Sequence, residues 1–125
     1  MTYEETLHYL YTSIPVFQHS GASAYKPGLG TSIALDDYLG NPHKAYKTIH
    51  VAGTNGKGSV SHLLAAILRQ SGFKVGLYTS PHLVDFRERI RVNGKKISQD
   101  YVVDFVERHR SFFEPLHPSF FELTS

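Results

Sequence analysis

One glycine-rich segment, residues 53–59, holds the residues best suited to chemistry. Glycines let a backbone turn with positive φ and approach a ligand with no Cβ in the way. The lysine of this segment, Lys57, could reach a β- or γ-phosphate, and the hydroxyl of Ser59 could bind Mg²⁺. We expect positive φ at its three glycines, which are Gly53, Gly56 and Gly58. The segment therefore predicts a phosphate-binding loop made of Gly53, Thr54, Asn55, Gly56, Lys57, Gly58 and Ser59.

The residues on either side of this loop favour the same interpretation. An apolar, β-branched run with Ile49 and Val51 precedes it, and apolar residues at helical spacing follow it over 60–68. Strand, glycine turn and helix together direct backbone N–H groups and the positive end of the helix dipole at one point. The match to G-x-x-x-x-G-K-[ST] is incomplete, because Val51 replaces the first glycine and Gly58 separates the lysine from the hydroxyl. A glycine turn with a surface lysine is the alternative.

The predicted fold class is α/β, with a P-loop-type parallel sheet, flanking helices and a β-hairpin. Residues 74–79 form a second predicted strand, and strand–helix–strand connections of this length give a parallel pair. Ser80 follows that strand, so we expect its hydroxyl on the phosphate side of the sheet. The hairpin is predicted over 86–97, with Asn93-Gly94 as a type I′ turn. Its alternating Arg89 and Arg91 fit an exposed strand face, and binding of an anionic substrate is the alternative.

The remaining segments are predicted to be helices and loops that support this sheet. Amphipathic spacing indicates helices over 3–14, 33–39 and 102–112, with a loop over 17–31. Thr2 with Glu5, and Ser119 with Glu122, have the spacing of capping boxes. Because the second capping box opens a helix only a few residues before Ser125, we expect the chain to be a piece of a longer polypeptide.

Composition excludes several classes of function. The 125 residues carry a net charge of +2, which gives no basic field for nucleic acid. Cysteine is absent, so neither disulfides nor cysteine-type zinc sites can form. The eight histidines are scattered without metal-binding spacing. No apolar run approaches the ~18 residues of a membrane helix. We therefore expect a cytoplasmic protein without a membrane or nucleic-acid partner.

Three blocks of the sequence resemble one family of enzymes. The loop spelling Gly-Thr-Asn-Gly-Lys-Gly-Ser closely resembles the phosphate loop of the folylpolyglutamate synthase/dihydrofolate synthase family, a branch of the Mur-type ATP-dependent amide ligases. The glycine between lysine and serine is typical of that folate branch. Residues 78–94 and 120–124 resemble the same family. The resemblance covers most of the chain and is least distinct over the first twenty-five or so residues.

The resemblance implies a reaction and a set of site residues. Family members use ATP and Mg²⁺ to join a folate or dihydropteroate carboxylate to L-glutamate through an acyl phosphate. In this sequence the resemblance implies that Lys57 stabilises the transferred phosphoryl group. It implies Mg²⁺ ligands at Ser59, Ser80 and Glu122, although spacing alone makes Glu122 a cap partner. The substrate-site candidates are Gly28, Leu29 and His82, although local chemistry alone makes residues 26–30 a turn.

The resemblance also implies that residues 1–125 are a single N-terminal fragment of the ATP-binding domain. The rest of that domain and the C-terminal glutamate-binding domain would be absent, so we expect the isolated chain to be inactive. The parent enzyme is expected to be a monomer, while an exposed sheet edge favours self-association of the fragment. Two alternatives stay open. One is a stand-alone nucleotide-binding or small-molecule kinase module, and the other is a non-catalytic fragment.

Overall fold

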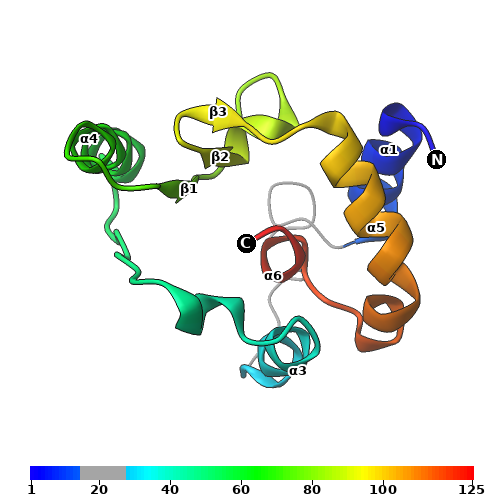
Figure 1. Ribbon diagram of the computed structural model, residues 1–125. Helices are drawn as coiled ribbons and strands as arrows, with labels where there is room; N and C mark the ends of the chain where they lie inside the picture. The colour runs from blue at the N-terminus through cyan, green and yellow to red at the C-terminus, as the bar shows by residue number, and fades with distance from the viewer. Residues whose placement is uncertain (15–27) are drawn as a thin grey trace. The chain divides into compact units, whose positions relative to one another are not determined.

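The structure is a computed structural model that describes residues 1–14 and 28–125. Its contacts divide the chain into two units (Figure 1). The helical unit comprises Met1–Thr48 and Asp100–Ser125, and the loop–sheet unit comprises Ile49–Gln99. The glycine-rich loop and Ser80 therefore lie in the second unit, whereas Glu122 lies in the first.

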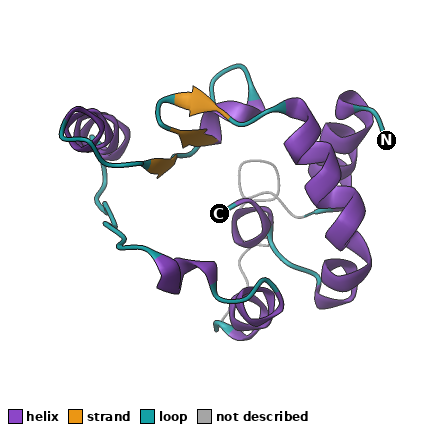
Figure 2. Ribbon diagram, in the orientation of Figure 1, coloured by secondary structure: helices purple, strands orange, loops and turns teal. Residues whose placement is uncertain are grey.

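The helical unit is built around two long helices that lie side by side, α1 and α5 (Figures 1 and 2). The hydroxyl of Tyr9 on α1 donates to the Glu114 carboxylate at a distance of 2.7 Å. The guanidinium of Arg110 on α5 lies 4.8 Å from the centre of the Tyr9 ring. The helices of this unit are α1 (Tyr3–Ser13), α3 (Gly30–Tyr38), η2 (Pro42–Ala45), α5 (Gln99–Phe113), η4 (Glu114–Leu116) and α6 (Phe120–Thr124).

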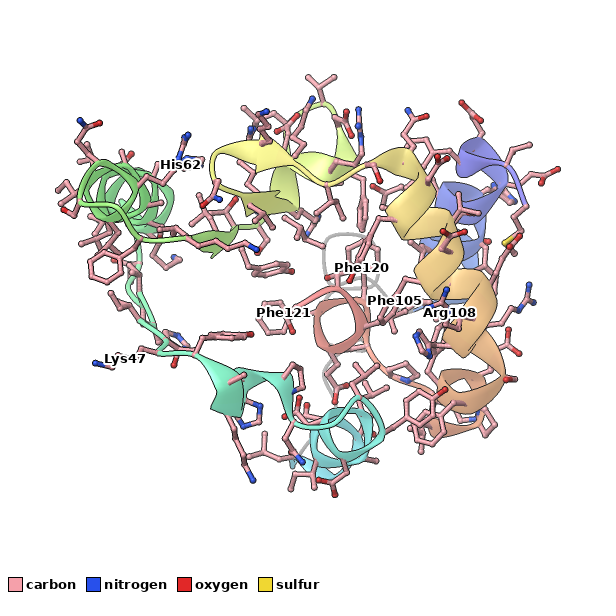
Figure 3. The ribbon with its side chains drawn as sticks, viewed as in Figure 1. Lys47, His62, Phe105, Arg108, Phe120 and Phe121 are labelled. Carbon is pink, nitrogen blue, oxygen red and sulfur yellow. The ribbon has the colours of Figure 1, made fainter. Side chains whose placement is uncertain are left out.

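The core of the helical unit consists of apolar side chains from four of its helices and their ends. On α6, Phe120 is buried while its neighbour Phe121 is 60% exposed. Figure 3 shows Phe105 on the side of α5 that faces α6, whereas Phe121 points away from α5. The buried apolar residues of this unit are Leu10, Ile14, Leu35, Val102, Val106, Phe113 and Phe120.

The helix boundaries of this unit largely follow the predictions. Both capping boxes are confirmed, Thr2 with Glu5 at α1 and Ser119 with Glu122 at α6. The predicted helix over 33–39 begins earlier, at Gly30, within the segment predicted to be a loop. It ends before Gly40, which has a φ of +85° as a C-terminal glycine requires. Of the rest of the predicted loop, residues 28–29 are in neither helix nor strand, as predicted, and residues 17–27 lie outside the described residues.

The loop–sheet unit consists of one long helix and a three-stranded antiparallel sheet. Its elements are α4 (Lys57–Gln70), β1 (Gly76–Tyr78), η3 (Phe86–Arg89), β2 (Ile90–Val92) and β3 (Lys95–Lys96). The strand order is β1-β2-β3, with Leu77 opposite Arg91 and Arg91 opposite Lys96. At the end of α4, the N–H groups of Gly72 and Phe73 donate to the carbonyls of Arg69 and Leu68. These two bonds form a Schellman motif that ends the helix at the predicted glycine.

The predicted parallel sheet is not confirmed. Within residues 1–14 and 28–125, no strand forms over 48–52, and each strand pair of the sheet is antiparallel. A strand exists only through hydrogen bonds to a neighbouring strand, and the strand that pairs with β1 is β2. The edge that would bring Ser80 to the phosphate side is therefore not formed by these residues. Parallel pairing by residues 49–51 stays a prediction.

The hairpin is confirmed at its turn but not along its full length. Asn93 and Gly94 have φ values of +50° and +79°, as a type I′ turn requires. Residues 86–89, predicted to be strand, form the short helix η3 instead. Arg89 is therefore not on an exposed strand face, because its side chain is only 3% exposed.

Helix α4 has the predicted apolar stripe, but none of its residues is buried. Leu64 and Leu68 are half-buried, whereas Val60, Leu63 and Ile67 are exposed. Burial of apolar side chains therefore contributes little to the stability of α4. None of the described helices has the length and apolar character needed to span a membrane.

We expect Gly94→Ala to destabilise the protein by about 1–2 kcal/mol, because an alanine at positive φ is strained. A Cβ there would also overlap Nη1 of Arg69, whose side chain would have to move. Urea unfolding should show a lower midpoint. Gly76→Ala on β1 is the control, because its added Cβ would meet no atom within 4 Å. Equal midpoints for the two variants would contradict the expectation.

Candidate phosphate-binding site

The glycine-rich loop ends where α4 begins. Gly56 is the N-cap of this helix, with φ +75°, and Lys57 is its first residue. The N-cap residue is a glycine and has no side-chain oxygen. The N–H groups of the first turn therefore donate no hydrogen bond to a side chain at the N-cap position. The Lys57 ammonium donates to the carbonyl of Gly53, at 2.5 Å across the loop. The site therefore combines a side-chain cation with the positive end of a helix dipole.

Positive φ is confirmed at Gly53 and Gly56 but is wrong for Gly58. Gly58 lies inside α4 and has ordinary helical backbone angles, because it is the second residue of the helix rather than part of the turn. A Cβ added to Gly58 would have no heavy atom within 4 Å. The chain itself thus gives no steric reason for a glycine at this position.

The other residues of the loop are open to solvent. Thr54, Asn55 and Ser59 are exposed, and so is Lys57. The next serine along the helix, Ser61, instead donates its hydroxyl to the Lys57 carbonyl at 2.8 Å. An anion could therefore reach the loop, the lysine and Ser59 from solvent.

The loop between β1 and η3, residues 80–85, begins at the second predicted metal ligand. Ser80 is exposed and follows the carboxyl end of β1. Three consecutive backbone N–H groups, those of Leu83, Val84 and Asp85, donate to the Glu88 carboxylate at 3.0, 3.1 and 2.7 Å. The side chains of Leu83 and Val84 are each 90% exposed. Backbone hydrogen bonds rather than apolar packing therefore hold this loop in place.

Sequence reasoning missed the pair that anchors this loop. Asp85 is the N-cap of η3 and forms a capping box with Glu88. The spacing Asp-x-x-Glu was visible in the sequence and could have predicted a helical turn there. The Arg87 guanidinium beside Asp85 holds the pKa of that carboxyl well below its usual range. Lys96 on β3 also donates to Asp85, at 3.3 Å, so the carboxylate links η3 to the hairpin.

His82, a predicted substrate-site residue, is half-buried in the same loop. Its Nδ1 accepts a hydrogen bond from Nε of the buried Arg89 at 2.7 Å. Its ring meets that of Phe86 edge-on, with centroids 6.1 Å apart. Burial lowers the pKa of His82, and the Arg89 charge lowers it further. The imidazole is therefore neutral at physiological pH.

Glu122 is confirmed as a cap partner. Its Oε1 accepts from the backbone N–H of Ser119 and its Oε2 from the hydroxyl of Ser32, each at 3.0 Å. The described residues contain no group of three or more His, Cys, Asp or Glu side chains that could hold a metal. Glu122 belongs to the helical unit and Ser59 and Ser80 to the other, so their joint metal role stays a prediction.

The two remaining candidates lie where α3 begins. Gly28 has a φ of +83°, and Leu29 is the N-cap of α3, with its side chain exposed. Their part in substrate binding is untested by this geometry.

Comparisons with known proteins place these features in one class. No family model matches the chain. Its structure superposes on a crystal structure of folylpolyglutamate synthase from Thermotoga maritima with a TM-score of 0.82 and 45% identity, over 97% of this chain and 28% of that one. A folylpolyglutamate synthase solved in complex with AMPPCP and folate gives a TM-score of 0.79 and 33% identity, over 98% of this chain and 30% of that one. The fold is therefore that of a Mur-ligase-like α/β protein.

A curated relative leads to the same enzymes. The chain is 40% identical over 129 aligned residues to a Haloferax volcanii protein described as a probable bifunctional folylpolyglutamate synthase/dihydropteroate synthase. The match covers 98% of this chain but only 14% of the relative. Over its own length, the chain belongs to the folylpolyglutamate synthase/dihydrofolate synthase family and corresponds to an N-terminal part of those enzymes.

Glu88 gives the 80–85 loop a defined pH dependence. Backbone N–H donors, first that of Asp85, lower the pKa of Glu88 from 4.5 to about 2. Its stabilising contribution is therefore complete above pH 4.5 and is lost as the pH falls through about 2. We expect the backbone amide NMR signals of Leu83, Val84 and Asp85 to move with a midpoint near pH 2.

Glu88→Gln is the control for this titration, because glutamine has no carboxyl group to protonate. The amide signals of the variant should show no step near pH 2. A midpoint near 4.5 in the unsubstituted chain would show that the three N–H bonds do not stabilise the carboxylate.

Proposed function

We propose that this protein is part of an ATP-dependent ligase that joins a folate or dihydropteroate carboxylate to L-glutamate. The observation that carries the proposal is the start of α4, where a glycine loop, an uncapped helix N-terminus and Lys57 converge in an exposed site. The relatives support the choice of reaction, because a similar chain was solved with an ATP analogue and folate. The chain spans 14–30% of the relatives described above, so the complete reaction involves further residues.

The residues of the loop suit the transfer of a phosphoryl group to a carboxylate. Lys57 would exchange the Gly53 carbonyl for phosphate oxygens and so neutralise charge that develops during transfer. The backbone N–H groups at the start of α4 would hold the same phosphate. Catalysis of this kind depends on positioning and charge, so no side chain has to act as a nucleophile. The amine of glutamate would then displace phosphate from the activated carboxylate.

We assign the Mg²⁺ ligands to Ser59, Ser80 and Glu122. Two hydroxyls and a carboxylate are hard oxygen donors, which fits Mg²⁺, and the nucleotide phosphates and water would supply the rest of its shell. When bound, the ion would neutralise charge on the phosphates. An ionised carboxylate oxygen has more than one acceptor site, so the Glu122 oxygens could bind a metal ion beside the hydrogen bonds that they accept from Ser119 and Ser32. Gly28, Leu29 and His82 are assigned to the folate side of the site. The cytoplasmic location and monomeric parent stay predictions.

Lys57→Ala should weaken the binding of MgATP at least about tenfold, which corresponds to about 1.4 kcal/mol. The reason is the loss of the one side-chain cation of the loop. Isothermal titration calorimetry of the 125-residue chain is the measurement.

The control is Lys74→Ala, which removes another exposed lysine from the same unit but outside the loop. Its affinity should match that of the unsubstituted chain. The proposal fails for this chain if MgATP does not bind, or if both lysine variants lose the same affinity.

If these three residues bind Mg²⁺, substituting them should reduce the increase in ATP affinity that Mg²⁺ causes, without unfolding the protein. We expect Ser59→Ala, Ser80→Ala and Glu122→Gln each to reduce the ratio of ATP affinity with Mg²⁺ to that with EDTA. Ser61→Ala is the matched control, because its hydroxyl is bonded within the helix. Calorimetry measures the ratio, and thermal unfolding checks that the variants are folded. An unchanged ratio for any of the three would remove that residue from the metal site.

A further inference from the structure

The hydroxyl of Ser32 contacts the carboxylate that the proposed function assigns to Mg²⁺. Ser32 lies in the first turn of α3, and its Oγ donates to Oε2 of Glu122 at 3.0 Å. The two residues are 90 positions apart in the sequence, and both are half-buried. The helices that carry them, α3 and α6, belong to the same unit (Figure 1). A contact over this separation depends on the tertiary structure.

The hydrogen bonds of Glu122 fix the plane of its carboxylate. The terminal torsion of a glutamate side chain is broad, so a single hydrogen bond would leave the carboxylate able to turn. Here Oε1 accepts from the backbone N–H of Ser119 at the start of α6, and Oε2 accepts from the Ser32 hydroxyl of α3. Each oxygen is therefore held by a different helix.

The start of α3 also favours a negative charge at this position. The positive end of a helix dipole lies in the first turn, where Ser32 stands. That turn contains no acidic residue of its own, and its N-cap, Leu29, makes no side-chain hydrogen bond. The carboxylate that Ser32 contacts comes from α6 instead. A carboxylate that is oriented and stabilised before a cation arrives lowers the cost of binding that cation.

We propose that Ser32 is a positioning residue, whose hydroxyl holds the Glu122 carboxylate in the orientation that binds Mg²⁺. The proposal rests on the proposed function, because that function assigns Glu122 to the metal. Groups that donate hydrogen bonds to a metal-binding carboxylate orient it, and their loss lowers metal affinity about 10–100-fold. A carboxylate oxygen has more than one acceptor site, so the bond from Ser32 is compatible with a metal ion on the same oxygen.

The contact is tested first on the 125-residue chain without ATP or metal. Urea unfolding of Ser32→Ala, Glu122→Ala and the double variant forms a double-mutant cycle. We expect Ser32→Ala to lower the unfolding midpoint when Glu122 is present and to change it little when Glu122 is already alanine. Equal effects in the two backgrounds overturn the proposal. Leu35, one turn further along α3, is buried, so the loss of one hydroxyl should leave the helix in place.

The metal role is tested with Mn²⁺ alone, which prefers the same oxygen ligands as Mg²⁺. Paramagnetic broadening of the Glu122 NMR signals reports binding. Ser32→Ala should raise the Mn²⁺ concentration that is needed about tenfold, and Ser32→Thr, which keeps a hydroxyl, should restore it. Ser111→Ala, which removes an exposed serine hydroxyl from α5, is the matched control. An unchanged Mn²⁺ dependence in Ser32→Ala, or no broadening of Glu122 in the unsubstituted chain, overturns the proposal.

Calorimetry with ATP separates positioning of the metal ligand from a merely structural role. Ser32→Ala should lower the affinity for ATP in the presence of Mg²⁺ and leave the affinity in EDTA unchanged. Equal losses under the two conditions would show that Ser32 acts through the fold, and would overturn the proposal. If the unsubstituted chain does not bind MgATP, the proposed function fails for this chain, whereas the unfolding cycle and the Mn²⁺ titration still decide the role of Ser32.

Discussion

Backbone N–H groups at the start of a helix need acceptors, and this constraint distinguishes α4 from the three described helices that begin with a capping box. The N-termini of α1, η3 and α6 are each closed by a capping box, in which a carboxylate and a hydroxyl or second carboxylate take up the N–H groups. At α4 a glycine stands in the N-cap position and offers no oxygen. In the proposed function, a phosphate of the ligand would accept the N–H groups at this helix start. Lys57, which donates to the Gly53 carbonyl in the structure, would add a positive charge beside that phosphate.

A second constraint governs the loop that follows β1. Its exposed Leu83 and Val84 contribute little burial, so the loop cannot be held by the hydrophobic effect. Its order depends instead on one carboxylate, Glu88, which accepts three consecutive N–H groups. Arg89 completes the arrangement from the other side through Thr79 and His82. These hydrogen bonds give the loop a defined backbone although its two apolar side chains are exposed.

The two constraints meet in the loop–sheet unit, which carries the lysine, both candidate serines and His82. This unit has little apolar burial of its own, since α4 has no buried residue. Local hydrogen-bonded motifs therefore define its elements: a Schellman motif ends α4, a capping box starts η3, and a type I′ turn joins β2 to β3. Most of the buried apolar side chains lie in the helical unit, where Glu122 sits at the start of α6. The two units are thus stabilised in different ways.

Local signals in the sequence determined the glycine-rich loop, α4 with its closing glycine, two capping boxes and the Asn93-Gly94 turn. Each depends on residues a few positions apart, so short-range hydrogen bonding and backbone sterics are sufficient to specify them. The family was also evident from the sequence, because its motifs are contiguous. Strand pairing was not, since residues 49–51 and β1 look alike in sequence, and only β1 has a partner among the described residues. The burial of Arg89 and its bond to His82 likewise needed the tertiary structure. An arginine next to a strand is ordinarily exposed, and only the packing of η3 turns this one inward.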